Sequence, residues 1–266
     1  MLADRGDGPT ALQVLRRLGL DRPLPDTVHF YEARLAGGTA KVACGQIREG
    51  IDQIRAVGGR WEAIGAQNPD LAPWRAYLAQ ALLLLGHREE ARALADRHAA
   101  LARGWGAHRP LARALRVQGL TTGGPGGTAL LHESVKLARD SPGQLELSLV
   151  ELGAAERRAN RRTAAREPLE EGLALAHQCG ARSQQDCALA ELLAAGARPR
   201  RPPASGRDTL TPSELRIGGL AGSGQTNRQI AQWLFITQKT VETHLANTFR
   251  KLHIESRAQI PAALTR

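Results

Sequence analysis

The feature that most constrains this chain is a series of helix start signals between residues 210 and 264. Thr211-Pro212-Ser213-Glu214 places a hydroxyl at the N-cap, a proline at the first helical position and a carboxylate in the first turn. These groups suit the backbone N–H groups that a helix start leaves without partners. The capping spacing recurs twice, in Thr226 with Gln229 and in Ser256 with Gln259. Four short helices are therefore predicted here.

A very short connection joins the two central helices. Thr237 can cap a helix over residues 238–252, and only Phe235-Ile236-Thr237 separates it from a helix over residues 227–234. Two helices joined by a three-residue turn form a helix-turn-helix motif.

Hydrophobic periodicity gives the helix over residues 238–252 two faces. Its apolar face carries Val241, Leu245, Thr248, Phe249 and Leu252. The preceding helix is expected to pack on that face through Ile230, Trp233 and Leu234. The residues left exposed are Lys239, Glu242, Thr243, Ala246, Asn247 and Arg250. Cations, amides and small residues on an exposed helix suit contact with base edges and phosphates.

The charge of the chain is concentrated in the same region. From Arg198 to the end there are eleven Lys/Arg against four Asp/Glu, a net charge of +7, whereas the first 197 residues carry +3. The alternatives to DNA binding are a solvated basic face or a helix resting on an anionic membrane. Neither needs a supporting helix and a tight turn, so DNA is the favoured partner.

These residues resemble the DNA-binding domain of LuxR/FixJ-type transcriptional regulators. The motifs that carry the resemblance are Leu210-Thr211-Pro212 with Glu214, Asn227 with Ile230-Ala231, and Lys239-Thr240-Val241 followed by His244-Leu245. The resemblance covers about a fifth of the chain. It implies a recognition helix in the major groove and a homodimer on paired half-sites, formed through the last helix, residues 256–264.

The resemblance also implies roles for individual residues. Base edges would be contacted by Glu242, Thr243 and Ala246. Phosphates would be contacted by Asn227, Arg228, Lys239, Thr240, Asn247, Arg250 and Lys251. His244 matches a partly packed position, for which a structural role is expected.

Two features depart from the family pattern. Gly218-Gly219 interrupts the first helix, and each glycine costs roughly 1 kcal/mol relative to alanine in a helix interior. Gly218 is also expected to leave a cavity. Pro261 falls within the last helix, where it removes a backbone donor and is expected to kink or shorten the dimerising surface.

The first 195 residues are expected to be helical nearly throughout. Only nine residues of the chain are Phe, Trp or Tyr, so Leu, Ala, Val and Ile must build the core, which favours packed helices. Segments 73–106 and 146–180 align without a gap when Ala91 is placed on Ala165, an offset of 74 residues. Two further helix pairs fit in residues 26–57 and 109–139. A helix pair recurring every 34 to 40 residues resembles degenerate tetratricopeptide repeats, with an irregular helical bundle as the alternative.

A repeat array presents a concave groove for an effector or a partner protein. Trp61, Trp74 and Trp105 could line it, although core positions are the expected ones. The histidines at 29, 87, 98, 108 and 132 are expected to be exposed, whereas Cys44, Cys179 and Cys187 are expected to be reduced and mostly buried. Residues 196–209, rich in Pro, Gly and Arg, read as a linker.

Motifs for catalysis are missing. The order of helical repeats followed by this domain resembles the C-terminal part of the large ATP-binding LuxR-type regulators. No lysine follows glycine, as a phosphate-binding P-loop requires, so ATP binding is not expected within this chain. His132-Glu133 has Lys136 where a second zinc ligand would stand. Neither a metal, nor a cofactor, nor a catalytic residue is predicted.

The sequence therefore predicts an all-α protein: a TPR-like helical-repeat array (1–195), a linker (196–209) and a four-helix LuxR-type helix-turn-helix domain (210–266). The predicted function is a cytoplasmic transcriptional regulator that binds double-stranded DNA as a homodimer and an effector, a small molecule or a protein, through its array. No membrane association is expected, because no apolar run reaches the ~18 residues of a span. The alternative is an interaction scaffold or truncated remnant without effective DNA binding.

Overall fold

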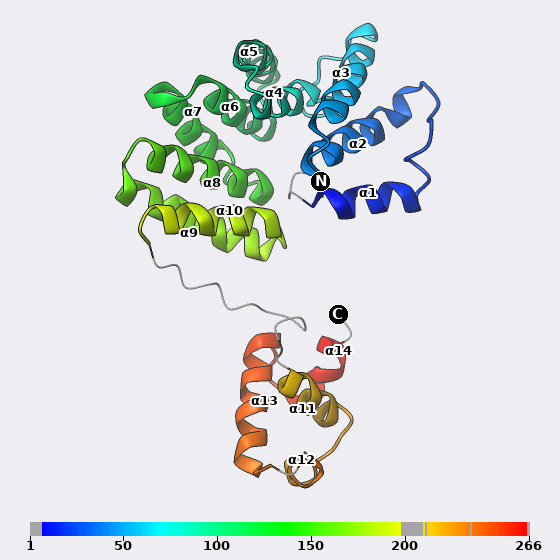
Figure 1. The fold of residues 1–266 in the computed structure, drawn as a ribbon, viewed down its shortest axis with the longest axis vertical. Coiled ribbons are helices and arrows are strands. Elements are labelled where there is room, and N and C mark those ends of the chain that lie inside the picture. The colour runs from blue at the N-terminus through cyan, green and yellow to red at the C-terminus, as the bar shows by residue number, and fades with distance from the viewer. Residues whose placement is uncertain (1–6, 198–209, 211, 235, 265–266) are drawn as a thin grey trace. The chain divides into compact units, whose positions relative to one another are not determined.

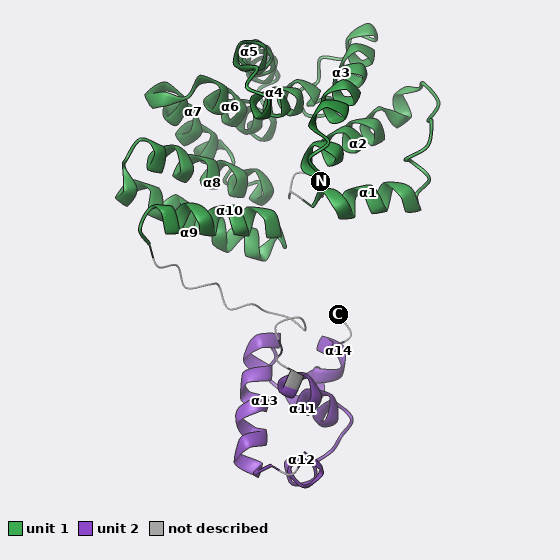
Figure 2. Ribbon diagram, in the orientation of Figure 1, with its two compact units in different colours: residues 1–199 green, residues 200–266 purple. Residues whose placement is uncertain are grey.

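Helices and their connections make up the described part of the protein. The computed structural model describes residues 7–197, 210, 212–234 and 236–264, and no strand occurs among them. The all-α prediction is confirmed. The chain divides into two compact units, residues 1–199 and 200–266 (Figure 2). Most of the predicted linker, and Thr211 with its predicted cap, lie outside the described residues.

The first unit is an array of helix pairs. The first helices of the pairs are α2 (Tyr31–Ala43), α4 (Trp74–Leu84), α6 (His108–Thr122) and α8 (Pro142–Arg158). The second helices are α3 (Ile47–Ala63), α5 (Arg88–Trp105), α7 (Gly124–Leu137) and α9 (Arg162–Gln178). The array begins with α1 (Gly8–Arg17) and a 3-10 turn, η2 (Val28–Phe30), and ends with α10 (Arg182–Ala194). The two helices of each pair share the most extensive contacts.

The last three of the four pairs recur at a regular interval. Helices α4, α6 and α8 begin at Trp74, His108 and Pro142, which are 34 residues apart each time. The first helices pack on one another in the order α2, α4, α6, α8, and α10 packs on α8 at the end of this row. The pairs follow an arc (Figure 1). Paired packing of the predicted segments is confirmed, while membership of the tetratricopeptide class stays a prediction.

Small residues stand where the two helices of a pair approach each other. A Cβ atom added to Gly50 would lie 2.7 Å from the backbone oxygen of Gly38. One added to Gly153 would lie 3.0 Å from the backbone oxygen of Ala165. Ala79 and Ala91 repeat this twelve-residue spacing and are fully buried. Close helix approach therefore explains why these positions carry glycine or alanine.

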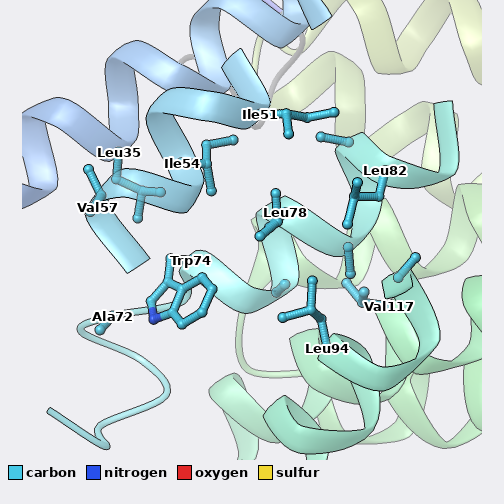
Figure 3. Packing of buried hydrophobic residues seen from close by; sticks show 14 of the residues in the cluster. Leu35, Ile51, Ile54, Val57, Ala72, Trp74, Leu78, Leu82, Leu94 and Val117 are labelled. Carbon is cyan, nitrogen blue, oxygen red and sulfur yellow. The ribbon is translucent and has the colours of Figure 1, made fainter. Parts of the chain in front are cut away.

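The core of the first pairs is aliphatic with two tryptophans. Trp74 lies among Leu35, Ile54 and Leu78 in the cluster of Figure 3, and Trp61 belongs to the same cluster. The core role expected for these two tryptophans is confirmed. Trp105 differs, because 53% of its surface is exposed.

Two expectations for polar residues of the array are wrong. His98 is 1% exposed, because its helix turns it into the interface between α5 and its neighbours. Burial, followed by the nearby charges of Arg113 and Arg75, lowers the pKa of His98 to about 4. The cysteines are free thiols as predicted, but Cys44 and Cys187 are exposed and Cys179 is half-buried. Cys44 and Cys179 follow the last residues of α2 and α9, and Cys187 lies on the outward face of α10.

The second unit is built from α11 (Pro212–Gly222), α12 (Asn227–Leu234), α13 (Gln238–Leu252), the 3-10 turn η4 (Arg257–Gln259) and α14 (Ile260–Leu264). Ile217, Ile230, Val241, Leu245 and Ile260 form the centre of its core. The bounds predicted for α12 and α13 are confirmed. None of the described helices of the chain is both long enough and apolar enough to cross a bilayer.

The departures at Gly218, Gly219 and Pro261 have small structural effects. Helix α11 continues through both glycines. A Cβ on Gly218 would lie 3.4 Å from Cγ2 of Thr248, so Thr248 lies directly beside the position that a side chain would occupy. Pro261 is the second residue of the five-residue α14, which follows η4, so the last helical segment is short.

Candidate nucleic-acid interface

The turn before α13 is fixed by hydrogen bonds at both ends. Thr237 has extended backbone angles (φ −80°, ψ 153°), and its Oγ1 accepts a hydrogen bond of 3.1 Å from the Thr240 N–H. The Ile236 N–H donates to the Ala231 oxygen at 3.0 Å. Thr237 is therefore the N-cap that the sequence predicts, and the turn is tied to α12. Phe235 lies outside the described residues.

One face of α13 is buried as predicted. Val241, Leu245, Thr248 and Leu252 are buried, and Phe249 packs against the same core. Because these residues anchor the helix, its opposite face is presented to the solvent.

The packing predicted for Trp233 is wrong. On α12 the inward positions are Ile230, Ala231 and Leu234, and Trp233 is 64% exposed. With about 100° of rotation per residue, positions 230, 231 and 234 centre the buried face away from position 233. The indole instead stands among the glutamines Gln225, Gln229 and Gln232 at the surface.

The exposed face of α13 brings the predicted DNA-contacting side chains together. Lys239, Glu242, Thr243, Ala246 and Arg250 are exposed, whereas Thr240, His244 and Asn247 are half-buried. The side chain of Lys239 is 87% exposed. The arrangement matches what base-edge and phosphate contact requires, which is a convex helix with accessible polar groups.

The bonds within this face are weak ones. Nζ of Lys239 lies 4.0 Å from Oε2 of Glu242, and Nη2 of Arg250 donates to Oδ1 of Asn247 at 3.3 Å. The Thr243 hydroxyl donates to the Lys239 backbone oxygen at 2.9 Å. Exposed pairs of this kind contribute at most about 1 kcal/mol, so a phosphate or a base can replace them.

Two of the predicted phosphate contacts are engaged within the unit. Nζ of Lys251 donates to Oε2 of Glu214 at 2.6 Å, and the Glu214 side chain is buried. Oδ1 of Asn227 accepts a hydrogen bond of 2.8 Å from Nη1 of Arg257. Arg228, beside Asn227 at the start of α12, is exposed.

Arg257 is an organising residue that the sequence reasoning missed. Its guanidinium donates from Nε to the Ala221 oxygen at 3.2 Å, from Nη1 to Asn227, and from Nη2 to the Gln225 oxygen. It thereby joins η4 to the end of α11 and the start of α12. No local pattern distinguishes this arginine from a solvated one, although it lies between Ser256 and Gln259, whose predicted capping box is confirmed. The cap of Thr226 by Gln229 is confirmed as well.

The sequence of this unit matches a known family. Residues 208–262 match the family model described as "Bacterial regulatory proteins, luxR family". The transcriptional regulatory protein LiaR of Bacillus subtilis is 46% identical over 52 residues, which are 20% of this chain and 25% of LiaR. The DNA-binding transcriptional activator DevR/DosR of Mycobacterium tuberculosis is 39% identical over 64 residues, which are 24% of this chain and 28% of the activator.

A much larger relative aligns over a similar length. A candidate HTH-type transcriptional regulator of Mycobacterium tuberculosis is 41% identical over 61 residues, which are 23% of this chain. The chain thus spans about 7% of that relative and about a quarter of LiaR. These matches agree with the capped turn, the buried face of α13 and its exposed polar face. The C-terminal part of the chain is therefore a LuxR-family helix-turn-helix domain, which implies DNA-binding transcriptional regulation.

Proposed function

We propose that the protein is a sequence-specific transcriptional regulator that inserts α13 into the major groove of double-stranded DNA. The observation that carries the proposal is the exposed polar face of α13, held outward by a buried apolar face. In this proposal, bases are contacted by Glu242, Thr243 and Ala246. Phosphates are contacted by Asn227, Arg228, Lys239, Thr240, Asn247, Arg250 and Lys251.

The proposed docking face consists of the exposed face of α13 and the start of α12, and its residues suit different groups of the DNA. The Glu242 carboxylate can accept a hydrogen bond from a cytosine amine, and Ala246 suits a thymine methyl group. Lys239, in the first turn of α13, can neutralise a phosphate next to the groove edge. Arg228 is an exposed cation at the start of α12, where the helix dipole also favours an anion.

The assembly and the role of the array are further parts of the proposal. The last segment, η4 with α14, would form a homodimer on paired half-sites, and its exposed Pro261 and Ala262 offer a small surface without charge. The array would bind an effector or a partner protein, since stacked helix pairs form a concave surface. The protein would act in the cytoplasm without an enzymatic step.

The test compares DNA binding of Lys239→Ala and Arg216→Ala over a range of salt concentrations. Arg216 is the matched control, because it is an exposed cation on α11. Lys239→Ala should weaken binding to all DNA sequences alike and lower the salt slope by about one unit, since one phosphate contact is lost. Glu242→Ala should instead change the ranking of DNA sequences. Unchanged binding by Lys239→Ala at every salt concentration would refute the proposed docking face.

A further inference from the structure

The helical array contains a surface cavity of about 370 Å³, called the hollow below. Its wall is formed by residues of α2, α3, α4, α6, α8 and α10, which are mostly the first helices of successive pairs. Volumes of 300–1,000 Å³ are typical of sites for small molecules. The size fits a small molecule.

Most of the wall is apolar. Val42 comes from α2, Leu83 from α4, Leu120 from α6 and Leu147 from α8. Such a wall favours the burial of an apolar ring or chain, because burial removes apolar surface from water.

The polar part of the wall centres on an ion pair between the buried Arg116 and the half-buried Glu151. Nη1 of Arg116 donates to Oε1 of Glu151 at 2.6 Å and to Oε1 of Gln80 at 3.4 Å. The Arg116 side chain is 4% exposed. Nε of Arg116 and Oε2 of Glu151 are buried and have no hydrogen-bond partner in the described part of the chain.

This pair carries more hydrogen-bonding capacity than the protein uses. A buried charged group without its full set of hydrogen bonds costs free energy, which a ligand can recover by supplying them. Burial raises the pKa of Glu151, although the charge of Arg116 opposes that shift. The two charges cancel, and among the residues that the structure describes no other charged one lines the hollow. A ligand with a net charge would therefore leave one charge unbalanced.

We propose that this hollow binds a small uncharged molecule with an apolar body and a carboxamide-like head, whose donor reaches Glu151 and whose acceptor reaches Arg116. The inference rests on the proposed regulatory function, for which such a molecule is the effector. It identifies the class of effector by its chemistry: apolar, neutral, and carrying a hydrogen-bond donor beside an acceptor.

Three probes with one apolar body and different heads test the proposal: phenylacetamide, phenylacetate and 2-phenylethylammonium. Each is titrated into the full-length protein at neutral pH, and binding is followed through the NMR methyl signals of Val42, Leu120 and Leu147. Phenylacetamide should shift these signals with a Kd at least tenfold lower than that of either charged probe. Equal binding of the three probes, or no shift of the three signals up to the solubility limits, would overturn the proposal.

Two substitutions should reverse the charge preference. Glu151→Gln leaves the guanidinium without its anion, so phenylacetate should become the preferred probe. Arg116→Gln leaves the carboxylate, so 2-phenylethylammonium should become preferred. The control is Glu171→Gln, which opens an exposed ion pair of the same 2.6 Å length with Arg139 and should keep the wild-type ranking. An unaltered ranking in both folded variants contradicts the proposal.

The probe experiments can be interpreted separately from DNA binding, and a variant that fails to fold does not leave the proposal untested. Far-UV circular dichroism and the methyl spectrum report folding, and the wild-type ranking decides the question if a variant unfolds. DNA binding is measured on the same protein without probes. Loss of the probe ranking with intact DNA binding refutes only the effector site, whereas the reverse result refutes only the DNA-binding function.

Discussion

Two lysines of α13 have different surroundings. Lys239 is almost fully exposed, whereas the amine of Lys251 is bound by the buried carboxylate of Glu214. Lys251→Met should lower the free energy of unfolding of the second unit by about 3 kcal/mol, because it removes the cation that the buried Glu214 carboxylate faces. Amide hydrogen exchange in α11 and α13 measures this loss. Both lysines are proposed phosphate contacts, so the salt slope of DNA binding should fall by about one unit in Lys251→Met and in Lys239→Met alike. Only Lys251→Met should also lower the free energy of unfolding.

A buried histidine makes the stability of the array depend on pH. The pKa of His98 is about 4 in the folded protein and near its usual 6.5 when unfolded, so the unfolded chain binds the extra proton between these values. Stability is therefore full above pH 6.5, falls as the pH drops, and loses about 3 kcal/mol by pH 4. Unfolding followed by tryptophan fluorescence should show a flatter pH dependence for His98→Leu. His87→Gln, at an exposed position, should keep the wild-type dependence.

At the scale of the helix, α11 can be stabilised by replacing one of its glycines. Gly219 is exposed in the middle of α11, and among the described residues no atom beyond its chain neighbours and the backbone of α11 lies within 4 Å of an added Cβ. Gly219→Ala should therefore raise the unfolding free energy of the second unit by roughly 1 kcal/mol, since alanine restricts the unfolded chain and favours helix. Hydrogen exchange of the α11 amides measures the change. Gly218→Ala, which meets Thr248 at 3.4 Å, should gain no more than Gly219→Ala, and a loss of stability at position 219 would contradict this account.

At the scale of the whole molecule, charge and the LuxR-family match both lie in the C-terminal part. Residues 205–266 alone should unfold in one cooperative transition whose midpoint rises when mixed DNA fragments are added, because a ligand that binds only the folded state stabilises it. Residues 1–197 should show no such rise. If residues 205–266 show no cooperative transition, or if DNA does not raise its midpoint, the scaffold or remnant interpretation is favoured.

Local signals predicted much of the second unit. Capping residues and turn length gave α12 and α13 their bounds, because caps act within four residues of the chain. The role of Arg257 was not predictable, since its partners Ala221 and Asn227 are about thirty or more residues away. The core position predicted for Trp233 is wrong because α12 has only eight residues. The apolar pattern of so short a helix is compatible with two neighbouring orientations about the helix axis, and only one of them buries Trp233.

The sequence by itself determined that the protein is an all-α array followed by a helix-turn-helix domain. The features that indicate this are helical periodicity, small residues at recurring spacing, capped helix starts and an excess of positive charge in the C-terminal part. Those properties are local or repetitive, so they can be read along the chain. Only the tertiary structure decided which polar groups are buried. Arg116 and Glu151 come from α6 and α8, and His98 meets the charges of Arg113 and Arg75 from other helices. Burial and pairing arise from packing between distant segments, which no single stretch of sequence encodes.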